Sequence, residues 1–296
     1  MTLSVGGDDR LSNMERLERA VQASPACDGP WGELGQAYQE AGQHELAAEV
    51  LRRATRLDPG FAPWWYALSM SLAEIDDREG SLDAARRAAE VAPDKTYILV
   101  NLGRKLLWSD RPREAVLHLE QAVRLAPSHP VPLGVLGIAR FRVGDHAGAV
   151  ECLEESLRRD PDDPVLWTYL GASLDEVGRH RAAIDALESA LFSRPGYGWA
   201  WGRLGKVLHA LGRHEEALRA FDESVEHGFA PSVLWFDMGR SAAAVKDAAR
   251  VERACNELER LAPPMAAALR CEIAKREAEE PPAPAAPGST LAGHGG

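Results

Sequence analysis

Five of the eight tryptophans in this chain of 296 residues lie on a single period of 34 residues. They are Trp31, Trp65, Trp167, Trp201 and Trp235, and the two open places in the series hold Leu99 and Leu133. A repeat of this length cannot bury an apolar face alone, so neighbouring repeats must stack to form a core. The period therefore predicts an elongated repeat array.

Other residue types keep the same period. An apolar residue follows the tryptophan series by three places, and the next residue is small: Gly35, Ser69, Gly103, Gly137, Gly171, Gly205 and Gly239. A closing proline recurs at Pro59, Pro93, Pro127, Pro161, Pro195 and Pro263, with Phe229 as the exception. These series predict seven repeats, numbered 1 to 7: residues 28–61, 62–95, 96–129, 130–163, 164–197, 198–231 and 232–265.

Each repeat is expected to contain two helices. Apolar residues recur twice per repeat at three- and four-residue spacing, which is typical of amphipathic helices. Glycines at Gly42, Gly144, Gly178 and Gly212 are placed to end the first helix in the left-handed conformation. The closing proline cannot continue the second helix. The two helices are then expected to pack as an antiparallel pair, with Gly35 and its equivalents admitting a neighbouring backbone.

The pattern Trp31-x-x-Leu34-Gly35-x-x-Tyr38, followed by Gly42, Ala47, Leu51, Ala54 and Pro59, resembles the tetratricopeptide repeat (TPR) family. The resemblance covers residues 28–265. It implies an all-α fold, an α-solenoid in which antiparallel helix pairs form a right-handed superhelix whose first helices line the concave face. Repeat 7 departs from the pattern, with Lys246 at the glycine position and Val251 and Leu258 at positions for small residues.

The segments that flank the repeats are also predicted. Residues 1–9 are expected to be a flexible N-terminus. Residues 10–27 are interpreted as the second helix of a further repeat, since Leu17, Ala20 and Pro25 lie one period before Leu51, Ala54 and Pro59. Residues 266–280 are predicted to form a polar capping helix, which a solenoid needs to stay soluble. The Pro-, Ala- and Gly-rich residues 281–296 are predicted to be a disordered tail.

The bulk charge and the absence of targeting signals narrow the class of function. The net charge of −11 opposes binding to phosphate backbones, so nucleic acid is an unfavoured partner. The sequence contains no run of eighteen apolar residues, so it predicts no membrane span. The first ten residues do not have the pattern of a signal peptide. We therefore expect a cytoplasmic protein.

No sequence motif argues for catalysis or for a bound metal. The four cysteines lack the two-residue spacing of metal and redox motifs, and no phosphate-binding loop or nucleophile motif occurs. His44, His146, His180 and His214 share one phase, but packed helices lie about 8–10 Å apart. This separation is too large for successive ring nitrogens to share one zinc ion at about 2.0–2.1 Å. We expect no enzyme, no cofactor and no metal site.

The inner face of the first helices is the predicted binding surface. Aromatic and basic residues gather at the positions that face away from the tryptophan series, and arginine and aromatic rings are frequent anchors of interfaces. The candidate site residues are Tyr66, Tyr97, Asn101, Arg104, Trp108, Phe141, Arg142, Trp199, Lys206, Phe236 and Arg240. They favour a protein or peptide partner that carries carboxylates and apolar anchors.

Other partners are weighed against this one. The same aromatic and basic groove would also accommodate a small molecule or RNA. Binding of a chaperone's C-terminal carboxylate is disfavoured, because Gly32 and Gln36 stand where Lys and Asn would be wanted. Self-association through the end helices is left open. The sequence thus predicts a non-catalytic scaffold or adaptor and does not name its partner.

Overall fold

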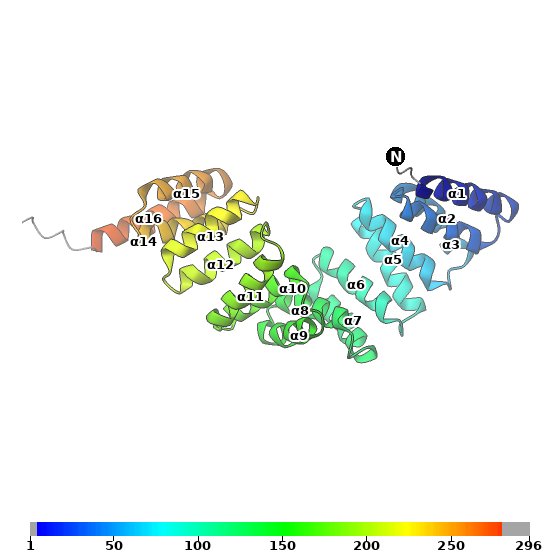
Figure 1. Ribbon diagram of the computed structural model, residues 1–296, viewed down its shortest axis with the longest axis horizontal. Coiled ribbons are helices and arrows are strands. Elements are labelled where there is room, and N and C mark those ends of the chain that lie inside the picture. The colour runs from blue at the N-terminus through cyan, green and yellow to red at the C-terminus, as the bar shows by residue number, and fades with distance from the viewer. Residues whose placement is uncertain (1–4, 280–296) are drawn as a thin grey trace, which may run out of the picture. The chain divides into compact units, whose positions relative to one another are not determined.

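The computed structural model describes residues 5–279, which contain sixteen helices and no strand (Figure 1). These residues divide between Ser193 and Arg194 into two compact parts, called here the N-terminal part and the C-terminal part. The all-α prediction is confirmed. The handedness of the superhelix stays a prediction, and the predicted tail at 281–296 lies outside the described residues.

The N-terminal part consists of one leading helix and five helix pairs. Each first helix packs against the second helix of its own repeat. The bounds are α1 (Val5–Ala23), α2 (Asp28–Glu40), α3 (His44–Leu57), α4 (Ala62–Glu74), α5 (Arg78–Val91), α6 (Thr96–Trp108), α7 (Pro112–Leu125), α8 (Pro130–Val143), α9 (His146–Arg159), α10 (Pro164–Glu176) and α11 (His180–Ser193). The leading helix α1 thus includes residues 5–9, which precede the helix predicted at 10–27.

The C-terminal part contains the remaining two pairs and one last helix. The bounds are α12 (Gly198–Ala210), α13 (His214–Glu226), α14 (Ser232–Ala244), α15 (Ala248–Leu261) and α16 (Pro263–Glu279). Helix α16 begins three residues before the predicted capping helix, because proline is favoured in the first turn of a helix, where its missing N–H is not needed.

Within a repeat, a large side chain of the second helix packs directly on the small residue of the first helix. A β-carbon added to Gly35 would lie 2.5 Å from Leu51 Cγ, and one added to Gly171 would lie 2.6 Å from Leu187 Cγ. Gly103 with Leu119 and Gly137 with Leu153 repeat this arrangement. Since no side chain fits in that space, glycine is what allows the two helices to approach so closely.

Repeat 2 solves the same packing problem with a different pair of residues. Ser69 takes the place of the glycine, and Ala85 stands sixteen residues later, where the other repeats of the N-terminal part carry leucine. Both residues are fully buried. The larger residue on the first helix is thus matched by a smaller one on the second helix.

The tryptophan and proline series are joined by a hydrogen bond between consecutive repeats. In the N-terminal part, the indole N–H donates to the proline carbonyl six residues earlier, with distances of 3.1 Å for Trp31 to Pro25, 3.0 Å for Trp65 to Pro59 and 2.7 Å for Trp167 to Pro161. In the C-terminal part, Trp201 donates to Pro195 at 2.8 Å. The first helix of one repeat is thereby tied to the turn that closes the preceding one.

The turn between the two helices of a repeat contains one residue with positive φ. The predicted glycines have this conformation, with φ of 72° at Gly42, 87° at Gly144, 80° at Gly178 and 73° at Gly212. Asp76, Asp110 and Lys246 occupy the same place in their repeats, with φ between 54° and 60°. The turn conformation therefore follows from the packing of the helix pair and persists where the residue is not glycine.

Replacing glycine by alanine at two helical positions tests this packing. Gly171→Ala is expected to lower the free energy of unfolding by roughly 1–3 kcal/mol, because the new methyl group overlaps Leu187. Gly29→Ala is the matched control, since a β-carbon there would meet nothing within 4 Å. It should cost clearly less than Gly171→Ala, because Gly29 lies in the first turn of α2 and the new methyl group meets open space. Urea unfolding followed by circular dichroism measures both values, and equal effects would contradict the packing account.

Candidate functional site

In the N-terminal part the first helices form one layer. Helix α2 contacts α4, α6 contacts α8 and α8 contacts α10, whereas consecutive second helices have no comparable backbone contact. Helices α4 and α6 are the exception, since their backbones are not in comparable contact either. The layer of first helices is therefore least tightly closed between repeats 2 and 3.

A pair of tyrosines stands at this exception. Gly32 and Gly134 occupy a position where a β-carbon would overlap a side chain of the next first helix, that of Trp64 or Leu166. In repeat 2 this position holds Tyr66. Its ring meets Tyr97 of α6 edge to face, with the ring centroids 5.2 Å apart. Aromatic rings thus make a contact between α4 and α6.

A hollow of about 680 Å³ lies at this place. Helices α4, α6 and the start of α8 form its walls, and four of the predicted site residues line it: Tyr66, Tyr97, Asn101 and Arg104. The ring of Tyr97 is 49% exposed, whereas Asn101 is only 5% exposed. The amide of Asn101 donates to Ser69 Oγ at 3.2 Å, so this residue also has a structural role in the floor of the hollow.

The charge around the hollow is mostly positive. Lys95, Arg104 and Lys105 line it together with a single carboxylate, that of Asp94. Burial lowers the pKa of Lys105; Glu74 opposes this shift, and the neighbouring Arg104 adds to it. A ligand carboxylate in the hollow would favour the charged form of the lysine and would be held by it.

A second hollow of about 310 Å³ adjoins the first. The two share Arg104 and Val131. The second is lined by the carboxylates of Asp160 and Asp163 and mainly by apolar side chains, including Leu107, Val135, Ile138, Val165 and Leu166. We call the two hollows together the Arg104 groove. A guanidinium at the junction of a polar aromatic hollow and an apolar one is an arrangement that fits a carboxylate flanked by an apolar side chain.

The other predicted residues of the N-terminal part lie outside this groove. Trp108 is covered by cations, with the guanidinium of Arg78 at 4.9 Å and the ammonium of Lys105 at 5.8 Å from its ring centre. The ring of Phe141 packs edge to face against His146 and Tyr169. Arg142 donates to Asp110 at 2.7 Å. Their observed contacts are therefore structural.

The C-terminal part holds the remaining predicted residues. Trp199 lies near Tyr197, with ring centroids 6.0 Å apart, and Phe236 is half-buried on α14. Lys206 of α12 acts on the carboxyl of Asp237, whose pKa is raised mainly by burial; Arg240 and Lys206 oppose this rise. Arg240 pairs with Glu272 at 2.9 Å.

Arg240 also lines a hollow of about 510 Å³ with His209, His214, Glu272 and Arg276. His209 lies opposite Ser241 Oγ, 2.7 Å from its Nδ1. Burial, followed by the nearby Arg240 and His214, lowers the pKa of His209 to about 4, although Glu272 opposes the shift. At neutral pH this hollow therefore carries a neutral imidazole beside an arginine–glutamate pair.

The phased histidines are helix-start residues. His44, His146, His180 and His214 are the first residues of α3, α9, α11 and α13, as their phase predicts. Among the described residues, no group of three His, Cys, Asp or Glu side chains could hold a metal ion. Likewise, none of the helices between Val5 and Glu279 is both long enough and apolar enough to cross a membrane.

Sequence reasoning missed half of the Arg104 groove. The apolar hollow is formed by residues that the repeat phase assigns to packing, such as Leu107 and Ile138. Lys105 lines the first hollow beside Arg104 but was not among the predicted site residues. One signal could have found the place: Tyr66 is a large residue at the position that holds Gly32 and Gly134 in other repeats.

Three features define a helical repeat scaffold: stacked helix pairs with a 34-residue period, a glycine–leucine contact within repeats 1, 3, 4 and 5, and a groove on the first helices. Models of the tetratricopeptide repeat match residues 14–71, 100–164 and 170–232, which together exceed half of the chain. The chain belongs to the tetratricopeptide repeat family. A search of curated protein sequences finds no match.

Solved structures share the fold at low identity. A chain of the APC/C hetero-tetramer Cut9–Hcn1 is 18% identical, with a TM-score of 0.64 over 78% of this chain and 46% of that chain. YrrB, described as a TPR protein with an unusual peptide-binding site, is 17% identical, with a TM-score of 0.55 over 63% of this chain and 96% of its own. MamA from Desulfovibrio magneticus RS-1 is 18% identical, with a TM-score of 0.52 over 57% and 96%. This chain thus spans less than half of the Cut9–Hcn1 chain, and the likenesses concern the fold alone.

The buried imidazole of the C-terminal part predicts a pH effect on stability. Because the pKa of His209 falls from 6.5 in the unfolded chain to about 4 in the folded one, the unfolded chain binds more protons between these values. Stability should therefore fall as pH drops from about 6.5 towards 4. His209→Asn should show a smaller fall than the wild type in melting temperatures measured across this window. Parallel curves for the two proteins would refute the assignment to His209.

Proposed function

We propose that this protein is a non-catalytic scaffold or adaptor, which binds a peptide or helix of a partner protein in the Arg104 groove. The observation that carries the proposal is the opening between α4 and α6, where Tyr66 and Tyr97 replace a direct contact between first helices. Aromatic rings of this kind are rigid, amphipathic anchors that lose little entropy on binding. The cytoplasmic location stays a prediction.

The chemistry of the groove favours a carboxylate-bearing segment. Arg104 is exposed and lies at the junction of the two hollows, with Lys95 and Lys105 around the first of them. An acidic side chain of the ligand would lie at Arg104, and a neighbouring apolar side chain would enter the hollow lined by Ile138 and Leu166. Peptide recognition commonly combines such a charged contact with an apolar pocket.

A small molecule or RNA is the alternative ligand of the same groove. The tyrosine pair would stack on a base and the cations would face phosphates. The net charge of −11 opposes this alternative, because a polyanion is repelled by the rest of the surface. RNA binding would be recognised by a steep loss of affinity with added salt.

Selection from a random library of displayed 12-residue peptides tests the proposal on the full chain. The selected peptides should contain Asp or Glu beside a bulky apolar residue. Arg104→Glu should weaken binding of a selected, fluorescently labelled peptide by at least about tenfold in an anisotropy titration, since it places a like charge against the ligand carboxylate.

Arg124→Glu is the matched control, because it makes the same charge change at an exposed position of α7 outside the groove. The affinity of Arg124→Glu for the selected peptide should stay within about twofold of that of the wild type, as expected for a distant exposed charge. If both variants bound the peptide equally weakly, the loss of affinity would come from the change in net charge and not from the groove. Failure to select any acidic peptide, together with salt-sensitive binding of an RNA oligonucleotide, would favour the alternative.

A further inference from the structure

The repeat phase continues into α16, which is the first helix of an eighth repeat. Leu269 falls one period after Trp235, and it is fully buried. Its Cδ2 fills the place that a β-carbon on Gly239 would need. Helix α16 also contacts α14 and α15, as α14 contacts α12 and α13 in the preceding repeat.

The sequence does not favour a second helix in phase with α16. Such a helix would lie one period after α15, at residues 282–295. Prolines occur at its start or just before it, at Pro281, Pro282, Pro284 and Pro287. Proline inside a helix removes a backbone hydrogen bond and clashes with the preceding turn. Residues 282–295 are therefore disfavoured as the second helix of this repeat.

The surface on which a second helix of this repeat would pack can be located from the other repeats. Neighbouring second helices lie side by side and are bridged by long side chains 28 residues apart, as in Arg86 with Glu114 at 3.3 Å and Arg250 with Asp222 at 2.9 Å. A second helix also covers the small residue of its own first helix, as Leu187 covers Gly171. A helix paired with α16 would accordingly lie beside α15 and over residue 273.

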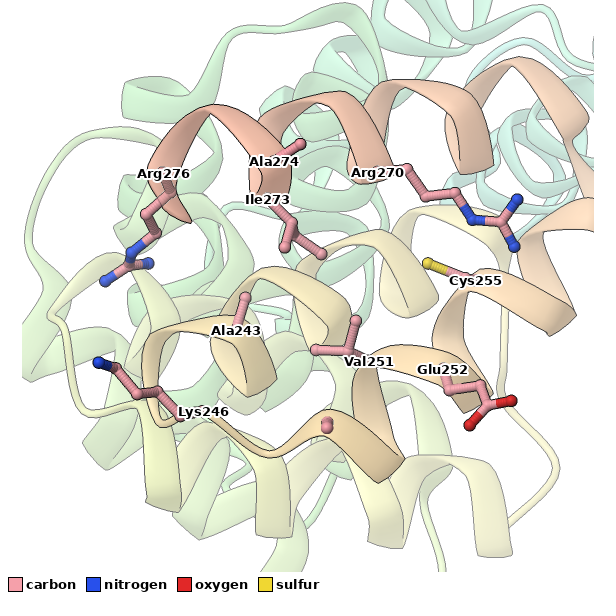
Figure 2. A pocket seen from close by; sticks show the side chains of 10 residues that line it. Ala243, Lys246, Val251, Glu252, Cys255, Arg270, Ile273, Ala274 and Arg276 are labelled. Atoms are coloured by element: carbon pink, nitrogen blue, oxygen red, sulfur yellow. The ribbon is translucent and has the colours of Figure 1, made fainter. Parts of the chain in front are cut away.

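A groove of about 510 Å³ occupies this place between α15 and α16. Figure 2 shows Ile273 of α16 pointing towards Val251 of α15, with Ala243 of α14 to one side of them. These side chains, together with Ala274, form an apolar strip. The groove belongs entirely to the C-terminal part and is independent of the Arg104 groove.

The rim of the groove is predominantly basic. Lys246, Arg270 and Arg276 line it, and Glu252 is the only carboxylate that does so. Arg270 is paired with Glu259 at 2.6 Å. Lys246 and Arg276 lie together at one end of the groove in Figure 2, so that end is complementary to an acidic segment.

Ile273 sets the shape of what can bind. It stands at the position that holds Gly or Ser in all seven repeats. A helix with leucine at the matching place would overlap it, whereas one with alanine would fit, as Ala85 fits opposite the larger Ser69 in repeat 2.

We propose that the groove between α15 and α16 binds an amphipathic helix of a partner protein, in the place of the second helix of an eighth repeat. The bound helix presents a small residue to Ile273 and acidic residues to Lys246 and Arg276. This adds a second interaction surface, of a defined kind, to the protein.

Two synthetic peptides test the proposal on the full chain. Both copy α13, His214–Glu226, an acidic second helix of this chain. In α13, Phe221 packs on Gly205, the residue that corresponds to Ile273 in α16. One peptide keeps phenylalanine at this position, and the other has alanine. In an anisotropy titration the alanine peptide should bind the wild type about tenfold more tightly than the phenylalanine peptide, because the large ring overlaps Ile273.

Variants of residue 273 and of Arg124 complete the test. Ile273→Gly should reverse the preference of the two peptides, with Ile273→Ala as the alternative if the glycine lowers the helicity of the protein. Ile273→Glu should abolish binding of the alanine peptide, and Arg124→Glu, at an exposed position outside both grooves, should leave it unchanged. Equal affinities for the two peptides, no binding of the alanine peptide, or equal loss of binding with Arg124→Glu would overturn the proposal.

Discussion

The contact between a glycine of the first helix and a large apolar side chain of the second is the interaction on which the rest of the structure depends. It brings the two helices of a repeat so close that no side chain fits between them at Gly35 or Gly171. The turn between the helices keeps a positive φ also at Asp76 and Lys246, where the residue is not glycine. In repeats 1, 2, 5 and 6 a tryptophan of the first helix donates to the proline six residues earlier, which ties that helix to the preceding turn.

Departures from this arrangement coincide with the candidate binding surfaces. Repeat 2 carries Ser69 opposite Ala85, and its Tyr66 stands where repeats 1 and 4 carry glycine, beside the Arg104 groove. Helix α16 carries Ile273 in place of the glycine, and it borders the groove beside α15. Each candidate surface thus lies beside a residue that is larger than the glycine of other repeats.

Much of the fold could be predicted because the repeat restates it seven times. The phased tryptophans, glycines and prolines predicted the helix pairs, and the family models confirm the repeat family over residues 14–71, 100–164 and 170–232. The site could be predicted only in part. Repeat phase placed Tyr66, Tyr97 and Arg104 on one face, where they line a common hollow. It could not foresee that Arg142 pairs with Asp110 or that Asn101 bonds to Ser69, because these contacts join residues 32 apart on different repeats. Their geometry depends on how far the first helices approach one another.

A double-mutant cycle at Gly171 and Leu187 tests most directly whether the glycine–leucine contact governs the packing. Leu187→Ala alone should cost roughly 2–5 kcal/mol of unfolding free energy, since it leaves a cavity at a fully buried position. In the double variant the methyl group of Gly171→Ala enters that cavity, as in the Ser69–Ala85 pair, so the combined cost should be smaller than the sum by about 1 kcal/mol or more. Additive costs would show that the two residues do not share one space and would contradict the account.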